Sequence, residues 1–256
     1  MSYSDETYFQ YLPVSTANLE WGLYLTGAGK TEVARREEYP PTGHPGTYDF
    51  KWDAGRVLPE YQIVFLSRGE GIFESPEMGE VKIYAGDVLL LFPGHWHRYR
   101  PNPQTGWRDH WIGWNGEYLY QIAKREYISA DCAVLRSGPL NTLLQLHEQI
   151  LSTMQEHPGE NSRVLAAIGM ELLATIIEST GDKPLEHSAR QLQRRDVKDK
   201  VVSAAIHYIW THSYRSSAGI DQLVEQLPVT RRTLERRFRA ALGCSVGEEY
   251  VRCRIG

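Results

Sequence analysis

The sequence predicts an α+β chain in which an antiparallel β-barrel is followed by a helical hairpin and then by a separate all-α domain. Short segments rich in β-branched and aromatic residues, divided by Gly, Pro and Asn, extend from residue 21 to about 122. From residue 140 to 179, apolar residues recur every three or four positions, as in amphipathic helices. A length of 256 residues is enough for two domains with separate cores.

Charge is unevenly distributed along the chain. Residues 198–256 hold ten Lys or Arg and six Asp or Glu, a net charge of +4. The whole chain carries −4, so the remainder carries −8. A basic domain on an acidic body predicts an anionic partner for the carboxy-terminal part only.

Cysteine usage and hydropathy indicate the compartment. Cys132, Cys244 and Cys253 lack the spacing of a zinc or redox pair, and such sparse cysteines are typical of reduced cytoplasm. The amino terminus has no signal-peptide pattern, and the longest apolar run, 88–92, is too short to span a bilayer. We therefore expect a cytoplasmic protein without a membrane partner.

The first two predicted elements are an amino-terminal arm, residues 1–20, and a β-barrel, residues 21–135. The arm carries Tyr8, Phe9 and Tyr11, which makes it too apolar for a free tail. Strands are expected at 61–67, 71–74, 81–84, 87–92, 97–100 and 108–114, with turns at 68–71 and 93–94. Short antiparallel strands of this number must close into a barrel or a two-sheet roll to hide their edges.

Residues 139–180 are predicted to form an antiparallel helical hairpin whose second helix begins near Ser162. Its apolar residues suffice to cover the barrel, and its outer face is a candidate seam for a homodimer. The polar segment 181–196 has little to bury and is predicted to be an interdomain linker.

The last predicted domain, residues 197–256, contains two short helices with a tight break at Pro228, which is helix-turn-helix spacing. Thr230 suits the N-cap of the second helix, and Leu234 and Phe238 suit its inner face. An arginine-rich outer face fits guanine edges and phosphates in a major groove, although a solvated basic face is the alternative. The predicted DNA-contacting residues are Thr230, Arg231, Arg232, Thr233, Glu235, Arg236 and Arg239.

This segment, read as Thr-Arg-Arg-Thr-Leu-Glu-Arg-Arg-Phe over 230–238, together with 242–255, resembles the arabinose-regulator (AraC/XylS) family. The resemblance implies a transcription regulator that binds double-stranded DNA and a small-molecule effector. Family members carry a linker helix and a second helix-turn-helix beyond the point where this sequence ends. We therefore expect a truncated DNA-binding domain and weak DNA binding, because half of the family's groove contacts are missing.

Residues 86–97, Gly-Asp-Val-Leu-Leu-Leu-Phe-Pro-Gly-His-Trp-His, resemble the second signature of the cupin barrel, a double-stranded β-helix. Metal-dependent cupins also need His-x-His and a Glu on an earlier strand, and the matching segment 61–67 has no His. We predict no metal, no cofactor and no catalytic residue, and we interpret His97 as a pocket or core histidine.

A barrel interior with aromatic faces and a few polar groups suits a sugar. The predicted ligand-binding residues are Arg56, Glu60, His97, Tyr99, Asp109 and Trp111. Alternation along a strand places Asp109 and Trp111 on one face and Ile112 on the other. In the arabinose sensor of the family, positions that match Tyr99 and Trp111 line the sugar pocket, which implies a sugar such as arabinose. The family's arm can fold over the bound ligand, and we expect the same of residues 1–20.

Two other functions are compatible with parts of this pattern. One is a cupin-type sugar isomerase or other sugar-processing enzyme with a basic helical tail. The missing His-x-His and the arginine-rich helix both argue against it. The other is a binding or scaffolding protein without regulatory output, which loss of a reporter response on changing Arg232 and Arg236 would exclude.

Overall fold

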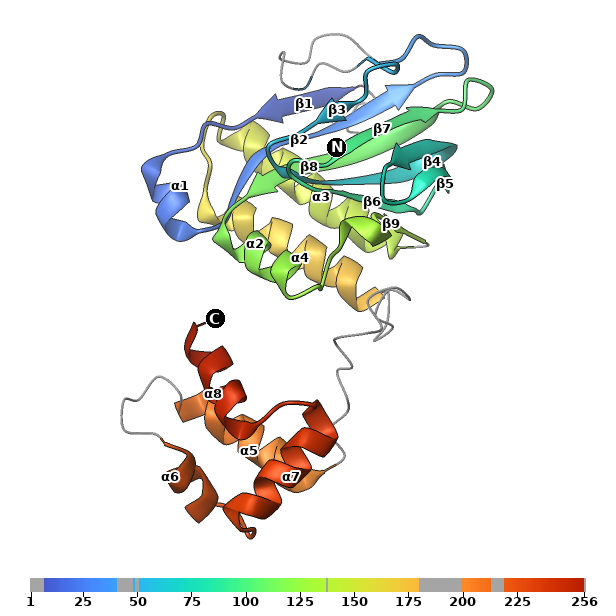
Figure 1. Cartoon of the computed structure of the whole chain (residues 1–256). Helices are drawn as coiled ribbons and strands as arrows, with labels where there is room; N and C mark the ends of the chain where they lie inside the picture. Colours follow the sequence, from blue (N-terminus) through green and yellow to red (C-terminus); the bar gives the residue numbers. More distant parts are fainter. Residues whose placement is uncertain are drawn as a thin grey trace. The chain divides into compact units, whose positions relative to one another are not determined.

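The computed structural model describes residues 7–40, 48, 51–136, 138–179, 199–212 and 219–255. The chain divides into two compact units, residues 1–188 and residues 189–256 (Figure 1). The predicted linker, 181–196, lies outside the described residues. None of the helices in these ranges is both long and apolar enough to cross a membrane.

The first unit is built on antiparallel strands arranged as a two-sheet, cupin-like barrel. One sheet has the order β1-β2-β8-β4-β6-β9, and β5, β4, β7 and β3 pair in the other. The strands are β1 (Tyr8–Tyr11), β2 (Tyr24–Val33), β3 (Arg56–Val57), β4 (Tyr61–Ser75), β5 (Gly79–Tyr84), β6 (Val88–Leu91), β7 (Trp96–Pro101), β8 (Trp107–Asn115) and β9 (Val134–Leu135). The predicted fold class, α+β with a cupin-like barrel, is confirmed.

The long strand β4 joins the two sheets, and here one sequence prediction is wrong. Residues 68–71 form no turn, because β4 continues through them and pairs first with β6 and β8 and then with β5 and β7. The pairing register shifts between Leu66 and Arg68, and Gly69 has a φ of +82°. Ser67 is therefore the extra residue of a bulge, and Gly69, two residues later, adopts a left-handed backbone, so the strand is redirected without being reversed.

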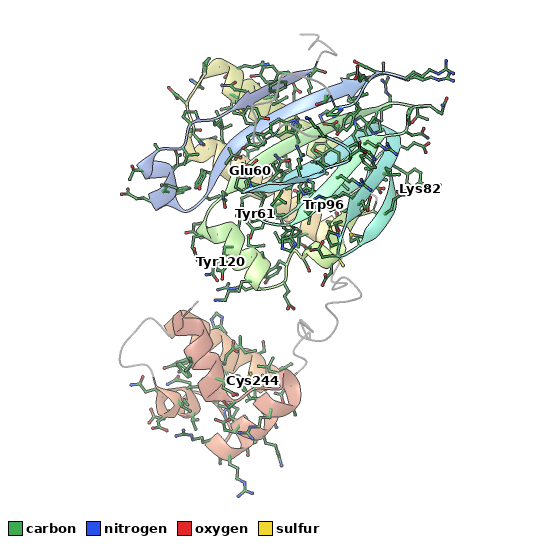
Figure 2. The ribbon with its side chains drawn as sticks, turned by 45° about the horizontal axis from the view of Figure 1, so that its top comes forward. Glu60, Tyr61, Lys82, Trp96, Tyr120 and Cys244 are labelled. Carbon is green, nitrogen blue, oxygen red and sulfur yellow. The ribbon has the colours of Figure 1, made fainter. Side chains whose placement is uncertain are left out.

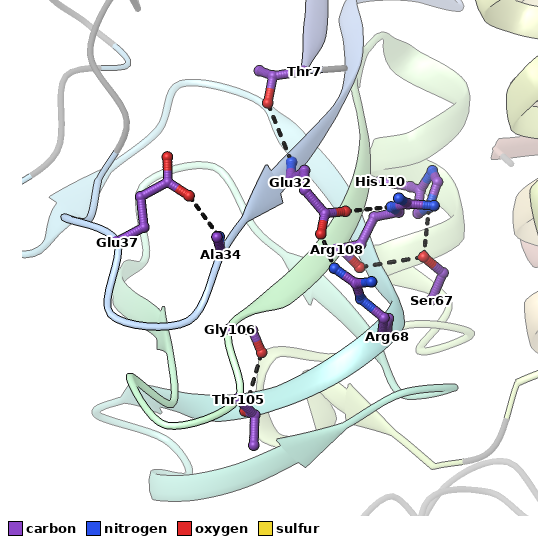
Figure 3. A network of polar contacts seen from close by, with 10 residues as sticks. All are labelled: Thr7, Glu32, Ala34, Glu37, Ser67, Arg68, Thr105, Gly106, Arg108 and His110. Carbon is purple, nitrogen blue, oxygen red and sulfur yellow. Dashed lines mark hydrogen bonds and ion pairs between the residues drawn. The ribbon is translucent and has the colours of Figure 1, made fainter. Parts of the chain in front are cut away.

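An ion-pair cluster holds the three central strands together beside this bulge (Figure 3). Glu32 on β2 accepts charge-assisted hydrogen bonds from Arg68 on β4 and Arg108 on β8. Farther along β8, His110 bonds through Nε2 to the Ser67 hydroxyl at 2.9 Å. Three strands that are distant in sequence are thus tied at the point where β4 changes sheets.

Helices cover the outer face of the sheet that contains β2 and β8 (Figure 1). The predicted hairpin appears as α3 (Leu140–Glu156) and α4 (Arg163–Ser179), which pack on each other and on β2. Gly169 allows close contact, since a β-carbon there would lie 3.2 Å from Leu25 and 3.4 Å from Trp114. Short helices α1 (Thr16–Trp21) and α2 (Glu117–Lys124) and the 3-10 turn η1 (Ala130–Cys132) were not predicted.

The alternation of β8 separates two apolar cores. Ile112 and Trp114 join the core between the sheet and the helices. Trp107 and Trp111 join the core inside the barrel, and Asp109 shares their face. The predicted placement of Asp109 and Trp111 on one face and Ile112 on the other is confirmed.

The second unit contains, among the residues described, the helices α5 (Lys200–His212), α6 (Ile220–Glu225), α7 (Arg231–Leu242) and α8 (Val246–Ile255). Leu234 and Phe238 on the inner face of α7 are fully buried, as predicted. The core of the unit consists of Val202, Ala205, Ile209, Leu223, Leu234, Phe238, Val246 and Tyr250.

Candidate ligand pocket and DNA-binding face

Arg56 is at the centre of the polar groups inside the barrel. Strand β3 pairs with β7 so that Arg56 lies opposite His97. Arg56 Nε donates to His97 Nε2 at 3.2 Å, and Nη2 donates to the Tyr99 hydroxyl at 2.5 Å. The rings of His97 and Tyr99 lie nearly parallel, at an interplanar angle of 5°. Three of the six predicted ligand-binding residues therefore form one hydrogen-bonded group.

A tight turn on the outside of the barrel positions Arg56. Gly55, with φ +63°, packs so closely on Trp96 that a β-carbon would lie 2.4 Å from its indole nitrogen. The same nitrogen donates to Ala54 O at 2.8 Å. The Arg98 guanidinium lies 4.4 Å from the centre of the Trp52 ring. The outward side chains of β7 thus hold the turn, while its inward side chains bind Arg56.

Burial shifts the pKa values of Asp109 and His97 in opposite directions, and in both cases it favours the neutral form. It raises the pKa of Asp109 to about 7, although Thr31, Arg56 and Trp107 counteract the rise. It lowers the pKa of His97 to about 3, and the charge of Arg56 adds to this effect. At neutral pH, His97 is therefore an uncharged acceptor for Arg56, and Asp109 can donate or accept a hydrogen bond.

An aromatic wall extends from Trp111. The ring of Tyr11 on β1 lies 5.6 Å from that of Trp111 and 4.4 Å from that of Tyr48, measured between centroids. Gly27 and Gly29 on β2 allow this approach: added β-carbons would lie 2.8 Å from Gln10 O and 2.6 Å from Phe9 Cβ. The described part of the predicted arm thus includes a sheet strand whose Tyr11 contacts Trp111, one of the predicted ligand-binding residues.

Glu60 lies just before β4 and is buried inside the barrel (Figure 2). Its carboxylate accepts from the Tyr48 hydroxyl at 2.9 Å and from Gln62 Nε2 at 3.0 Å. The sequence prediction missed Gln62, Tyr48 and Thr31. Alternation from Glu60 could have identified Gln62, whereas no local signal marks Tyr48, which lies between β2 and β3.

The histidines of the cupin-like signature do not act as a pair. His95 is exposed and binds Glu77 through Nδ1 at 2.7 Å, whereas His97 points inward to Arg56. Within the described ranges, no group of three or more His, Cys, Asp or Glu is placed to hold a metal ion.

In the second unit, α7 begins as predicted and presents a basic face. The Thr230 hydroxyl accepts from the Thr233 backbone N–H at 3.4 Å, which caps the helix. Arg232, Arg236 and Arg239 lie on this helix away from its buried inner face. Side chains of this kind on one helical face can contact phosphates and base edges together.

Two other predicted residues of this face have structural partners. Glu235 is half-buried and accepts from the Val246 backbone N–H at 3.4 Å at the start of α8. Arg231 forms an exposed ion pair with Asp221 at 3.0 Å. Arg237, which was not predicted to contact DNA, lies 3.3 Å from Asp199.

A cupin-like barrel with a polar interior, together with a helical unit that carries a basic capped helix, defines a ligand-binding transcription regulator. The sequence model of the AraC-like ligand binding domain matches residues 39–173, more than half of the chain. The chain belongs to this family and is a regulator of the AraC type.

Two curated relatives carry names of the same class. The chain is 25% identical over 199 residues to the lactose operon transcription activator of Staphylococcus xylosus, covering 77% of this chain and 68% of that protein. It is 25% identical over 203 residues to the Msm operon regulatory protein of Streptococcus mutans, covering 78% and 69%. These relatives are regulators, which confirms that the chain is not an enzyme and removes the sugar-isomerase alternative.

Among solved structures, a variant of ToxT in its apo form, from Vibrio cholerae strain SCE256, matches 96% of this chain and 82% of its own. The TM-score is 0.36 and the sequence identity is 14%.

Proposed function

We propose that the chain is a sugar-responsive regulator in which a neutral sugar binds inside the barrel and changes how the helical unit engages DNA. The observation that carries the proposal is the grouping of Arg56, Tyr99 and Asp109 beside the indole of Trp111. An aromatic face stacks on a sugar ring, and the polar groups supply both donors and acceptors for hydroxyls. The resemblance to the arabinose sensor makes arabinose the first candidate.

The arm supplies a route from the barrel to the rest of the chain. Tyr11 contacts Trp111, so a ligand on that indole would change what β1 packs against. A ligand can shift the regulator only through different affinities for two arrangements of the arm or domains. The outer face of the α3–α4 hairpin is proposed as the seam of a homodimer.

A thermal-shift screen of the whole chain against neutral pentoses and hexoses, sugar acids and divalent metals tests the proposal. A neutral sugar at a hundred times its dissociation constant is expected to raise the free energy of unfolding by about 2.7 kcal/mol. Trp111→Ala should abolish that shift by removing the stacking face. A shift produced by metals alone, or one unchanged in Trp111→Ala, would contradict the proposal.

For the helical unit, we expect the double variant Arg232→Ala and Arg236→Ala to weaken binding to a random-sequence DNA duplex. The slope of log K against log salt is negative, and each arginine–phosphate interaction that is lost should make it shallower by about 0.9. Fluorescence anisotropy over a salt series measures both quantities. Arg125→Ala, which removes an exposed arginine of the first unit, is the matched control and should leave the slope unchanged. An equal effect of the control would contradict this role for α7.

A further inference from the structure

The barrel interior has polar groups at two ends of one aromatic wall. The arginine end consists of Arg56, His97, Tyr99 and Asp109, and the glutamate end consists of Thr26, Tyr48, Glu60 and Gln62. Asp109 belongs to the first end, and Gly113, four residues along β8, underlies the second. At the rise of a β-strand this separation is about 13 Å, with Trp111 between. The residues that face the barrel interior are thus polar, then aromatic, then polar along one strand.

The glutamate end is built around a glycine. A β-carbon at Gly113 would lie 2.5 Å from Glu60 Oε1 and 2.6 Å from the Thr26 hydroxyl, so both side chains reach over its backbone. Glu60 and Gln62 are each only 3% exposed. A carboxylate this buried is retained at a cost unless hydrogen-bond donors surround it, and here Tyr48 and Gln62 donate to it.

Each end also contains a buried polar atom that forms no hydrogen bond of ordinary geometry with a described residue. At the glutamate end it is the Thr26 hydroxyl, whose weak interaction with Tyr48 lowers the pKa of that phenol without meeting hydrogen-bond geometry. At the arginine end it is the Trp107 indole nitrogen, which acts on the pKa of Asp109 in the same weak way. Buried polar atoms of this kind need a partner, and an unmatched one costs about 1–3 kcal/mol. Ligand hydroxyls at both ends would satisfy both atoms.

Tyr11 lies between the two ends. Burial is the largest influence on the pKa of its hydroxyl and raises it. Two smaller influences are the charge of Arg56, which lowers this pKa, and the charge of Glu60, which raises it. Both charged groups therefore lie within electrostatic range of one side chain on the aromatic wall, which makes the two ends parts of the same interior.

We propose that the effector is a neutral disaccharide, with one ring hydrogen-bonded at the arginine end and the second at the glutamate end. This rests on the proposed function and goes beyond a single pentose such as arabinose. Both ends offer donors together with acceptors, as hydroxyl groups require. Their separation along β8 exceeds the width of one sugar ring, and Trp111 between them suits the apolar faces of linked rings.

Calorimetric titration of the whole chain with arabinose, galactose, glucose, lactose, maltose, melibiose and sucrose tests the inference. We expect one disaccharide to bind at least ten times more tightly than any of the monosaccharides. Thr26→Val should weaken binding of that disaccharide about tenfold, as expected for removal of one hydrogen bond, and leave monosaccharide binding unchanged. Tyr99→Phe, at the arginine end, is the matched variant and should weaken both classes.

Thermal unfolding without ligand separates a binding defect from a folding defect. Within the described ranges the Thr26 hydroxyl meets no partner at hydrogen-bond geometry and interacts only weakly with Tyr48, so Thr26→Val should change the midpoint little. Tight monosaccharide binding with weaker disaccharide binding, or equal loss of both classes in Thr26→Val, would overturn the inference and leave the proposed function standing. Absence of binding by every sugar would overturn both.

Discussion

Replacing Phe238 by alanine is expected to unfold most of the second unit while the barrel remains folded. Phe238 is fully buried in the core that α5, α7 and α8 share. Removing a buried phenylalanine ring costs about 3–5 kcal/mol, because the transfer free energy is lost and a cavity remains. A unit of this size has a total stability of about 3–9 kcal/mol at ordinary values per residue, so the loss takes much or all of it.

Hydrogen exchange measured by mass spectrometry on the whole chain locates the damage. In Phe238→Ala, amide protection should fall in α5–α8 and persist in α3 and α4. The control is Val251→Ala, which truncates an apolar side chain that is 55% exposed and should change stability by less than about 0.5 kcal/mol. Retained protection of α7 in Phe238→Ala would show that the core tolerates the cavity, contrary to this prediction.

Acidification from pH 7 to pH 5 is expected to remove about 3 kcal/mol from the free energy of unfolding of the barrel unit. Burial lowers the pKa of His97 and His110 to about 3 and that of His147 to about 4. In the unfolded chain these side chains titrate near 6.5. Below that pH the unfolded state therefore binds protons that the folded state does not, and each histidine costs about 1.4 kcal/mol per pH unit.

Asp109 partly offsets this loss. Because burial raises its folded pKa to about 7, the folded state takes up its proton at a higher pH than the unfolded state does. This contribution increases stability as pH falls from about 7 to about 4. Once the histidines of the unfolded state are protonated, the unfolded state binds about two more protons than the folded state. The free energy of unfolding then falls by about 2.7 kcal/mol for each pH unit of acidification.

Urea unfolding at a series of pH values, followed by tryptophan fluorescence, measures this slope. His110→Phe should reduce this slope by the contribution of one proton, because phenylalanine does not titrate. The variant should still fold, since a phenyl ring can keep the stacking on Phe65, where the ring centroids are 5.0 Å apart. His157→Phe, at an exposed position, is the control and should leave the slope unchanged. Stability that is constant between pH 7 and pH 5 would contradict the assignment of buried, neutral histidines.

The periodic pattern alone determined the main elements of both units. Alternation correctly divided β8 into an inward face with Asp109 and Trp111 and an outward face with Ile112, because side chains of a strand must alternate. Helical spacing and an N-cap likewise placed Thr230, Leu234 and Phe238. These signals are local, so they could be recognised without knowledge of the fold.

Tertiary structure decided what depends on contacts between distant segments. Near Gly69, β4 passes from one sheet into the other because β5 and β7 of the second sheet supply pairing partners there. The local sequence at 68–71 is typical of a turn and could not show that the strand continues. Tyr48 reaches Glu60 from outside the strands, and Gly113 makes room for Glu60 only once β8 and β4 are paired. The sequence by itself thus determined the regulator class, the inward face of β8 and the basic helix. The two-ended interior arises only from folding, because long-range pairing brings its residues together.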